Sequence, residues 1–135
     1  MDKIEEFNNY REKMNKRILE VGNLQTKRFF SLDSNTYKEG ELDSKTKELL
    51  GLVASTVLRC DDCIKYHLIQ SKKEKATYSE LVEALNIALV VGGSIVIPHF
   101  RRAIEFLDEI EGRVEKWVIY IYLMEPLYFT ELFTE

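Results

Sequence analysis

The chain has 135 residues, of which 45% are hydrophobic and 31% are charged, and its formal net charge is −4. This length predicts a single domain with one hydrophobic core. The acidic balance argues against a nucleic-acid or anionic-membrane partner, because no basic stripe is present to contact phosphates. The charged start is unlike a signal peptide, and no apolar run is long enough for a membrane span. We therefore expect a cytoplasmic protein.

The first helix is predicted over residues 2–21, where apolar side chains recur on one helical face. That face is narrow, so we expect the helix to pack along a single seam, with another subunit as a candidate partner. Residues 22–42 are rich in turn formers and are predicted to be a connection with at most one short helical turn. Three aromatic residues are interpreted as pinning this connection to the core, in preference to forming a substrate wall: Phe29, Phe30 and Tyr37.

Two further helices are predicted on either side of a short break. Asp43 can cap the first of them, which carries a broad apolar face as far as Leu58. The second is expected to open around Cys60 and to run to about Lys73. The break between them therefore lies just before the first cysteine.

The next two helices carry recognisable boundary signals. Thr77 and Glu80 match a capping box, which predicts a helix start followed by apolar residues at helical spacing. The glycine pair at residues 92–93 should end that helix. Ser94 is expected to cap the following helix, with Pro98 in its first turn, where a missing N–H group is tolerated.

No convincing hairpin signal appears before residue 114, so the predicted fold class is all-α, with about six helices in a single domain. The tail is different, because residues 117–129, "WVIYIYLMEPLYF", mix β-branched and aromatic residues and are interrupted by a Glu-Pro pair. This segment is compatible with a strand, a helix or a swapped arm. An apolar terminal segment marks an interface more often than a membrane contact, so we expect residues 114–135 to contribute to a homo-oligomer.

Both cysteines of the chain and one of its two histidines lie within "LRCDDCIKYH", residues 58–67. A structural disulfide is disfavoured, because the loop it closes is tiny and the expected compartment is reducing. A zinc site needs four ligands, of which Cys60, Cys63 and His67 supply three, so His99 would have to arrive from elsewhere. Buried packing cysteines are a further alternative, although "RCDDC" is too polar to bury easily.

The interpretation that we favour is a redox-active dithiol. A helix that begins near Cys60 presents unpaired N–H groups, which favour a thiolate. Cys63 and His67 are four residues apart and share a helix face, so the imidazole can take the thiol proton. The other cysteine can resolve an oxidised sulfur as a disulfide. Asp61 and Asp62 oppose a nearby thiolate electrostatically, which argues against this interpretation.

The spacing of four residues resembles a known family. Glu48, Cys60, Cys63 and His67 follow the pattern E-x11-C-x2-C-x3-H of alkylhydroperoxidase D-like proteins, within the carboxymuconolactone decarboxylase superfamily. The flanking segments are also similar to that family's core, and the similarity covers about residues 24–110.

The resemblance implies an all-helical fold that assembles as trimers or hexamers. The N-terminal helix, residues 1–22, precedes the part of the chain that the resemblance covers. It implies hydroperoxide reduction, or disulfide exchange with a partner such as a peroxiredoxin, with a cellular dithiol as reductant. By position, Glu48 and His67 would be the proton relay, and Cys60 and Cys63 the redox pair. We expect no cofactor and no metal ion.

One position departs from the family pattern. The hydroperoxidase has a histidine immediately before the second cysteine, and here that position is Asp62. Part of the relay is therefore altered. His99 is interpreted as a structural or interfacial residue.

Two other functions are alternatives. A carboxymuconolactone decarboxylase-type enzyme acting on a small lactone acid would need cations for the substrate carboxylates, with Arg59, Arg101 and Arg102 as candidates. The decarboxylase branch typically lacks the cysteine pair, which disfavours this function. A non-enzymatic oligomeric redox sensor would instead form the disulfide reversibly without turnover.

Overall fold

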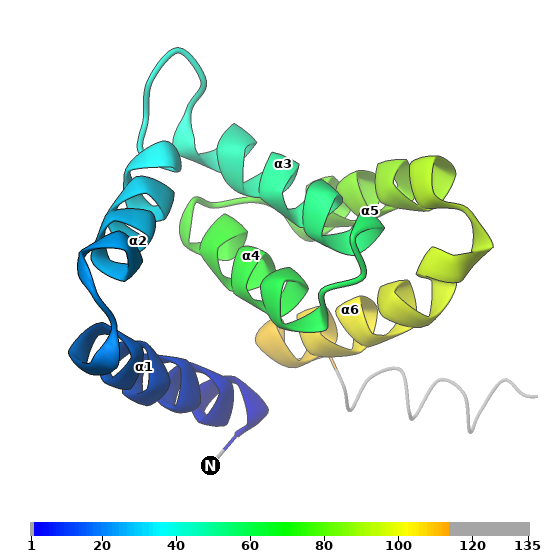
Figure 1. The fold of residues 1–135 in the computed structure, drawn as a ribbon. Coiled ribbons are helices and arrows are strands. Elements are labelled where there is room, and N and C mark those ends of the chain that lie inside the picture. Colours follow the sequence, from blue (N-terminus) through cyan, green and yellow to red (C-terminus); the bar gives the residue numbers. More distant parts are fainter. Residues whose placement is uncertain (1, 114–135) are drawn as a thin grey trace, which may run out of the picture.

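The computed structural model describes residues 2–113, and within them the chain forms six α-helices and one short 3-10 helix, η1 (Figure 1). The all-α prediction with about six helices is confirmed. No helix in this range is both long and apolar enough to cross a bilayer. The apolar tail, residues 114–135, lies outside the described residues. The elements are α1 (Lys3–Val21), α2 (Leu24–Thr36), α3 (Ser44–Val57), α4 (Asp61–Lys73), α5 (Tyr78–Gly92), η1 (Ser94–Val96) and α6 (Ile97–Ile110).

Four helices enclose the core. α3 packs on α4 and on α5, and α6 packs on the same two helices, so the four elements form a closed ring around one apolar centre. Each of the four helices supplies at least one fully buried leucine, and each such burial contributes about 1.5–3 kcal/mol. The fully buried leucines are Leu52, Leu68, Leu81, Leu85 and Leu107.

The first two helices lie to one side of this bundle (Figure 1). The narrow apolar face predicted for α1 finds an intrachain partner at its N-terminal end, where the ring of Phe7 meets that of Phe106 edge-on, with centroids 5.9 Å apart. The other end of the face is exposed, at Ile18 and Val21. The first helix therefore packs along one seam, and that seam includes α6 of the same chain.

Most of the predicted helix boundaries are confirmed. The side chain of Asp43 caps α3 by accepting the Thr46 N–H at 2.7 Å. Thr77 and Glu80 form both halves of a capping box at the start of α5. Each cap satisfies N–H groups that have no partner inside the helix.

The prediction of a loop over residues 22–42 is wrong, because α2 occupies 13 residues of it. Asn23 begins this helix, since its side chain accepts the N–H groups of Gln25 and Thr26 at 3.0 and 3.3 Å. No glycine or proline follows until Gly40. The polar residues that suggested turns are only weakly unfavourable inside a helix, so a good cap and an uninterrupted run outweigh them.

The prediction that Ser94 caps the last long helix is also wrong. Ser94 is instead the first residue of η1, and its side chain makes no capping hydrogen bond there. Gly93 turns the chain with a φ of +77°, a value that glycine tolerates, and its carbonyl accepts the Val96 N–H at 3.0 Å. α6 then starts at Ile97, with Pro98 in its first turn as predicted.

Candidate active site

The two cysteines lie at the start of α4 and form a disulfide, with their Cα atoms 5.3 Å apart. Cys60 is the N-cap of α4, and its sulfur accepts the N–H of Cys63 at 3.3 Å. Both residues are partly exposed. The prediction of a helix opening at Cys60 is confirmed, and the pair stands where backbone N–H groups favour negative charge on sulfur.

A tight helix ending brings the cysteines to this point. Arg59 has a φ of +61°, and its N–H donates to the Thr56 carbonyl while that of Cys60 donates to Ser55. These two bonds satisfy the last carbonyls of α3 in the pattern usually completed by glycine. A non-glycine residue in this conformation costs about 1–2 kcal/mol. The reversal lets α4 begin directly after α3, so the two helices run side by side.

α3 and α4 bring Glu48 and His67 together inside the protein. The Oε2 atom of Glu48 lies 2.7 Å from Nδ1 of His67, and each side chain is only 8% exposed. We assign the Nδ1–H tautomer, because a carboxylate can only accept a hydrogen bond. Nε2 is then the ring nitrogen that can accept a proton from another group.

Two tyrosines enclose the same imidazole. The Tyr37 hydroxyl lies 3.4 Å from Nε2 of His67, and the two ring centroids are 5.1 Å apart. Tyr66 meets the imidazole edge-on, with centroids 5.3 Å apart. Burial raises the pKa of Tyr37, and the negative charges of Glu48 and Asp33 raise it further. Tyr37 therefore stays protonated and donates its hydrogen bond to Nε2.

The three aromatic residues of segment 22–42 have different environments. Tyr37 follows α2 and reaches His67, a contact for which its position in the sequence carries no signal. Phe29 is 69% exposed, so it does not pin the chain to the core. Phe29 and Phe30 instead line a pocket of about 330 Å³ that also reaches Tyr66. The interpretation of these residues as core-pinning aromatics is therefore wrong for Phe29.

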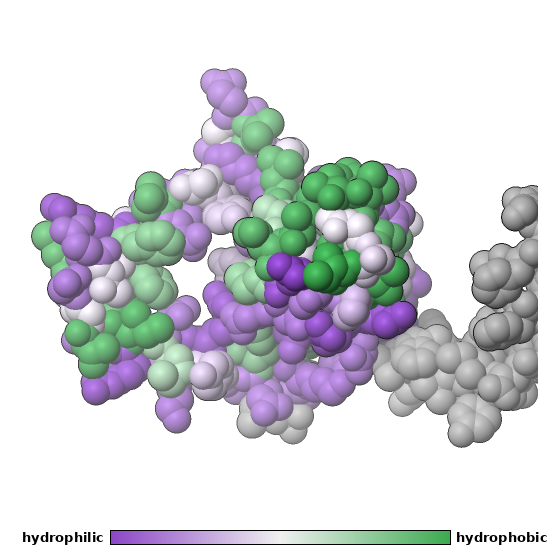
Figure 2. Space-filling view, turned by 45° about the vertical axis from the view of Figure 1, so that its right-hand side comes forward, coloured by the Kyte–Doolittle hydropathy of each residue, from purple (hydrophilic) through white to green (hydrophobic). Residues whose placement is uncertain are grey.

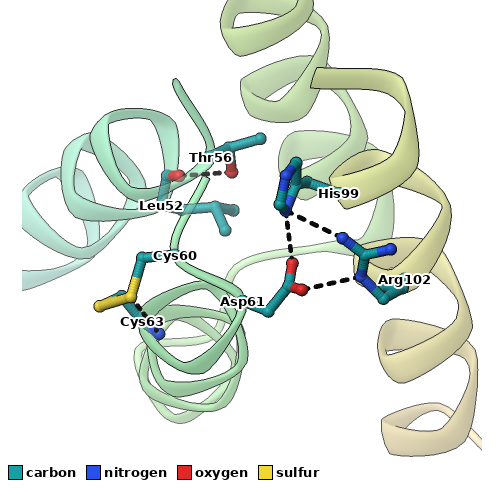
Figure 3. A network of polar contacts seen from close by, with 7 residues as sticks. All are labelled: Leu52, Thr56, Cys60, Asp61, Cys63, His99 and Arg102. Atoms are coloured by element: carbon teal, nitrogen blue, oxygen red, sulfur yellow. Dashed lines mark hydrogen bonds and ion pairs between the residues drawn. A yellow bond between two sulfur atoms is a disulfide. The ribbon is translucent and has the colours of Figure 1, made fainter. Parts of the chain in front are cut away.

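The carboxylates between the cysteines are both paired with cations from other helices. Asp61 lies 2.7 Å from Nδ1 of His99 and 2.8 Å from Nε of Arg102, both on α6 (Figure 3). Asp62 lies 2.7 Å from the guanidinium of Arg11 on α1. His99 and Arg102 therefore both bind the carboxylate of Asp61. Within residues 2–113, no group of three or more His, Cys, Asp or Glu residues is placed to hold a metal ion.

Residues 26–106 match the carboxymuconolactone decarboxylase family. The chain belongs to this family. The match confirms the family that the E-x11-C-x2-C-x3-H spacing indicated.

Solved members of the family share the fold. Two crystal structures of one Thermotoga maritima protein, which is 58% identical to this chain, superpose with TM-scores of 0.78 and 0.77. Each match includes 82% of this chain, together with 97% of the first crystallised chain and 94% of the second. That protein is described as a family member, and a part in an antioxidative response has been suggested for it. A family member from Legionella pneumophila is 32% identical, with a TM-score of 0.69. The match includes 81% of this chain and 97% of the Legionella chain.

A curated relative is known only as an uncharacterized protein. It is protein 4 of the cox locus of Paracoccus denitrificans, which is 31% identical over 84 residues. The match covers 62% of this chain and 76% of the relative. The solved relatives share the family and the fold with this chain.

Proposed function

We propose that the protein is a thiol-dependent oxidoreductase of the alkylhydroperoxidase D type, with hydroperoxides or protein disulfides as substrates. One observation carries the proposal: a cysteine pair that can form a disulfide lies at the start of α4, and His67, one turn further along this helix, is buried against Glu48 of α3. A dithiol and a proton acceptor are the two parts that such chemistry requires. The suggested antioxidative role of the Thermotoga maritima relative supports the same assignment.

The proposed cycle begins with the reduced dithiol. His67 accepts the thiol proton of Cys63 on Nε2, where it replaces the long hydrogen bond from Tyr37, because Nδ1 faces Glu48. The thiolate attacks a hydroperoxide oxygen, the O–O bond breaks, and the relay returns the proton to the leaving alkoxide. The resulting sulfenic acid of Cys63 is attacked by Cys60, which forms the disulfide and releases water. A cellular dithiol then reduces this disulfide and is itself oxidised to a disulfide.

With a protein disulfide as substrate, we propose Cys60 as the attacking residue. Its sulfur is at the N-cap of α4 and accepts the N–H of Cys63, which stabilises a thiolate there. Single Cys60→Ser and Cys63→Ser variants distinguish the two orders. A mixed disulfide with the substrate should accumulate in the Cys63→Ser variant if Cys60 attacks first.

The test is a peroxidase assay with several dithiol reductants, run on the wild type and on a variant with both cysteines replaced by serine. The wild type should turn over, and the double variant should be inactive. Mass spectrometry of the reduced protein after mild peroxide should show the loss of two hydrogens. Lactone decarboxylation that survives in the double variant would instead support the decarboxylase-type function, and reversible oxidation without turnover would support a sensor.

We also propose that the protein works as a homo-oligomer, a trimer or hexamer. Apolar side chains gather at the end of the bundle where α5 passes into α6 (Figure 2). An exposed cluster of this kind is typical of a contact surface. Its exposed members are Ile87, Val90, Val91, Ile95 and Ile97.

A further inference from the structure

The two cysteines are separated by two negative charges, which is an unfavourable sequence for thiolate chemistry. Asp61 adjoins Cys60, and Asp62 adjoins Cys63. Consecutive Cα atoms are about 3.8 Å apart, so each carboxylate belongs to a residue directly next to a cysteine whose sulfur must become negative. An unpaired carboxylate on a neighbouring residue would reduce the fraction of thiolate at neutral pH.

The structure places a positive partner on each of these carboxylates. Arg102 of α6 binds Asp61 through Nε at 2.8 Å, and His99 approaches the other oxygen of the same carboxylate at 2.7 Å (Figure 3). Burial alone would raise the pKa of Asp61, but the bonds from His99 and Arg102 outweigh it and lower that pKa. The carboxylate is therefore ionised and paired at neutral pH.

The partner of Asp62 comes from a different helix, α1. Arg11 of α1 donates to Asp62 at 2.7 Å. Its guanidinium carbon lies 4.4 Å from the centroid of Tyr66 and 5.5 Å from that of Phe7, so two aromatic rings hold it over α4. Neither arginine belongs to α4, and each is delivered by a helix far away in the sequence.

We propose that Arg102 and Arg11 are positioning residues for the dithiol, which offset the charges of Asp61 and Asp62 and so keep a thiolate available after the disulfide is reduced. This inference rests on the dithiol chemistry proposed above, and it explains how the chain tolerates aspartates where they would oppose that chemistry. The charged or titratable groups on this part of α4 or in contact with it, besides the two cysteines, are Arg59, Asp61, Asp62, Lys65, Tyr66, His67, Tyr37, Glu48, Arg11, His99 and Arg102.

The test measures the alkylation rate of the fully reduced protein by iodoacetamide as a function of pH, which requires no peroxidase activity. In Arg102→Gln, Asp61 loses its arginine, and the rate at pH 7 should fall about three- to tenfold, with the midpoint of the pH profile moved upward. Asp61→Asn should shift the profile in the opposite direction. The double variant should return close to the wild type, because both members of the pair are then neutral.

Three controls separate charge from structure. Arg102→Lys keeps the positive charge and should retain most of the rate. The deficit of Arg102→Gln should shrink in about 1 M salt, because exposed charges are screened. Arg11→Gln should reproduce the deficit, whereas Arg17→Gln, which removes an exposed partner of Glu20 on the same helix, should not.

The same alkylation rates distinguish an electrostatic role of the Arg102–Asp61 and Arg11–Asp62 pairs from a purely structural one. If Arg102→Gln and Asp61→Asn slow alkylation alike, or if the double variant is no better than Arg102→Gln, the proposal is overturned. If the predicted shifts occur in a protein that reduces no peroxide, the inference stands and only the proposed function fails.

Discussion

Gly51 of α3 lies directly against the imidazole of His67. A Cβ atom at this position would be 2.5 Å from Cε1 and 2.8 Å from both ring nitrogens. The imidazole cannot easily move aside, because Glu48 and Tyr37 hold its two nitrogens. This contact explains a glycine in the middle of a helix, where alanine is otherwise preferred by about 1 kcal/mol.

We expect Gly51→Ala to displace His67 and to lower the free energy of unfolding by about 1–3 kcal/mol, as overpacking does in a dense core. Thiol oxidation by peroxide should slow in the same variant. Gly40→Ala is the matched control, because a Cβ atom there would meet only Lys47 Nζ, at 3.6 Å. Urea unfolding and stopped-flow oxidation provide the two measurements. A stabilised Gly51→Ala variant with normal oxidation would show that helix propensity, and not the imidazole contact, decides this position.

Glu48 and His67 should act as one unit. Each of Glu48→Gln and His67→Asn should slow thiol oxidation about tenfold or more, because His67 is the proton acceptor and the Glu48 carboxylate orients its imidazole and stabilises the imidazolium. The double variant should be little slower than the worse single variant, as expected for partners at 2.7 Å. Rates are measured under single-turnover conditions with excess peroxide. Losses that add fully would mean that the two residues contribute independently.

Tyr37→Phe removes only the hydroxyl that faces Nε2 of His67. The hydrogen bond is long, at 3.4 Å, so we expect a loss of stability below about 1 kcal/mol and a larger effect on the oxidation rate, about three- to tenfold. Tyr10→Phe, at an exposed position on α1, is the control. Equal rates for the wild type and Tyr37→Phe would assign Tyr37 a packing role only.

The acid dependence of stability should include a contribution from Asp61. Its pKa is lowered in the folded protein, because the bonds from His99 and Arg102 outweigh the effect of burial. A lowered pKa contributes stability that is fully present above the unfolded value, about 3.9, and is lost as the pH falls through the folded value. The stability difference between the wild type and Asp61→Asn should therefore shrink below about pH 4, as urea titrations across this range would measure. A constant difference at all pH values would exclude this contribution.

The mass in solution should be several times 15.9 kDa. Light scattering at micromolar concentration measures it for the full chain and for a truncation that lacks residues 114–135. We expect the truncation to reduce the mass or the solubility, since the removed segment is strongly apolar. A monomeric full chain would contradict the prediction of a homo-oligomer. An unchanged mass after truncation would contradict only the prediction that residues 114–135 contribute to the assembly.

Much of the helical framework was determined by local sequence. Asp43, Thr77, Glu80 and the glycines at 92–93 act within one turn of their own helix, so their effect can be read without knowing the fold. The cysteine pair is equally local, because a three-residue offset at a helix start decides both its spacing and its N–H partner. The cap at Asn23 is just as local, but the turn-forming residues that follow it hide the start of α2 in the sequence.

Contacts between helices were decided only by the tertiary structure. The family pattern pairs Glu48 with His67 by position, nineteen residues apart, but only the packing of α3 on α4 sets the direct 2.7 Å contact between Oε2 and Nδ1 in a buried site. Arg11 and Arg102 stand still further from the aspartates that they neutralise. The sequence alone shows that Asp61 and Asp62 would repel a thiolate on the neighbouring cysteines. It does not show the arginines that neutralise them, because those lie on α1 and α6 and reach the aspartates only when the whole chain packs.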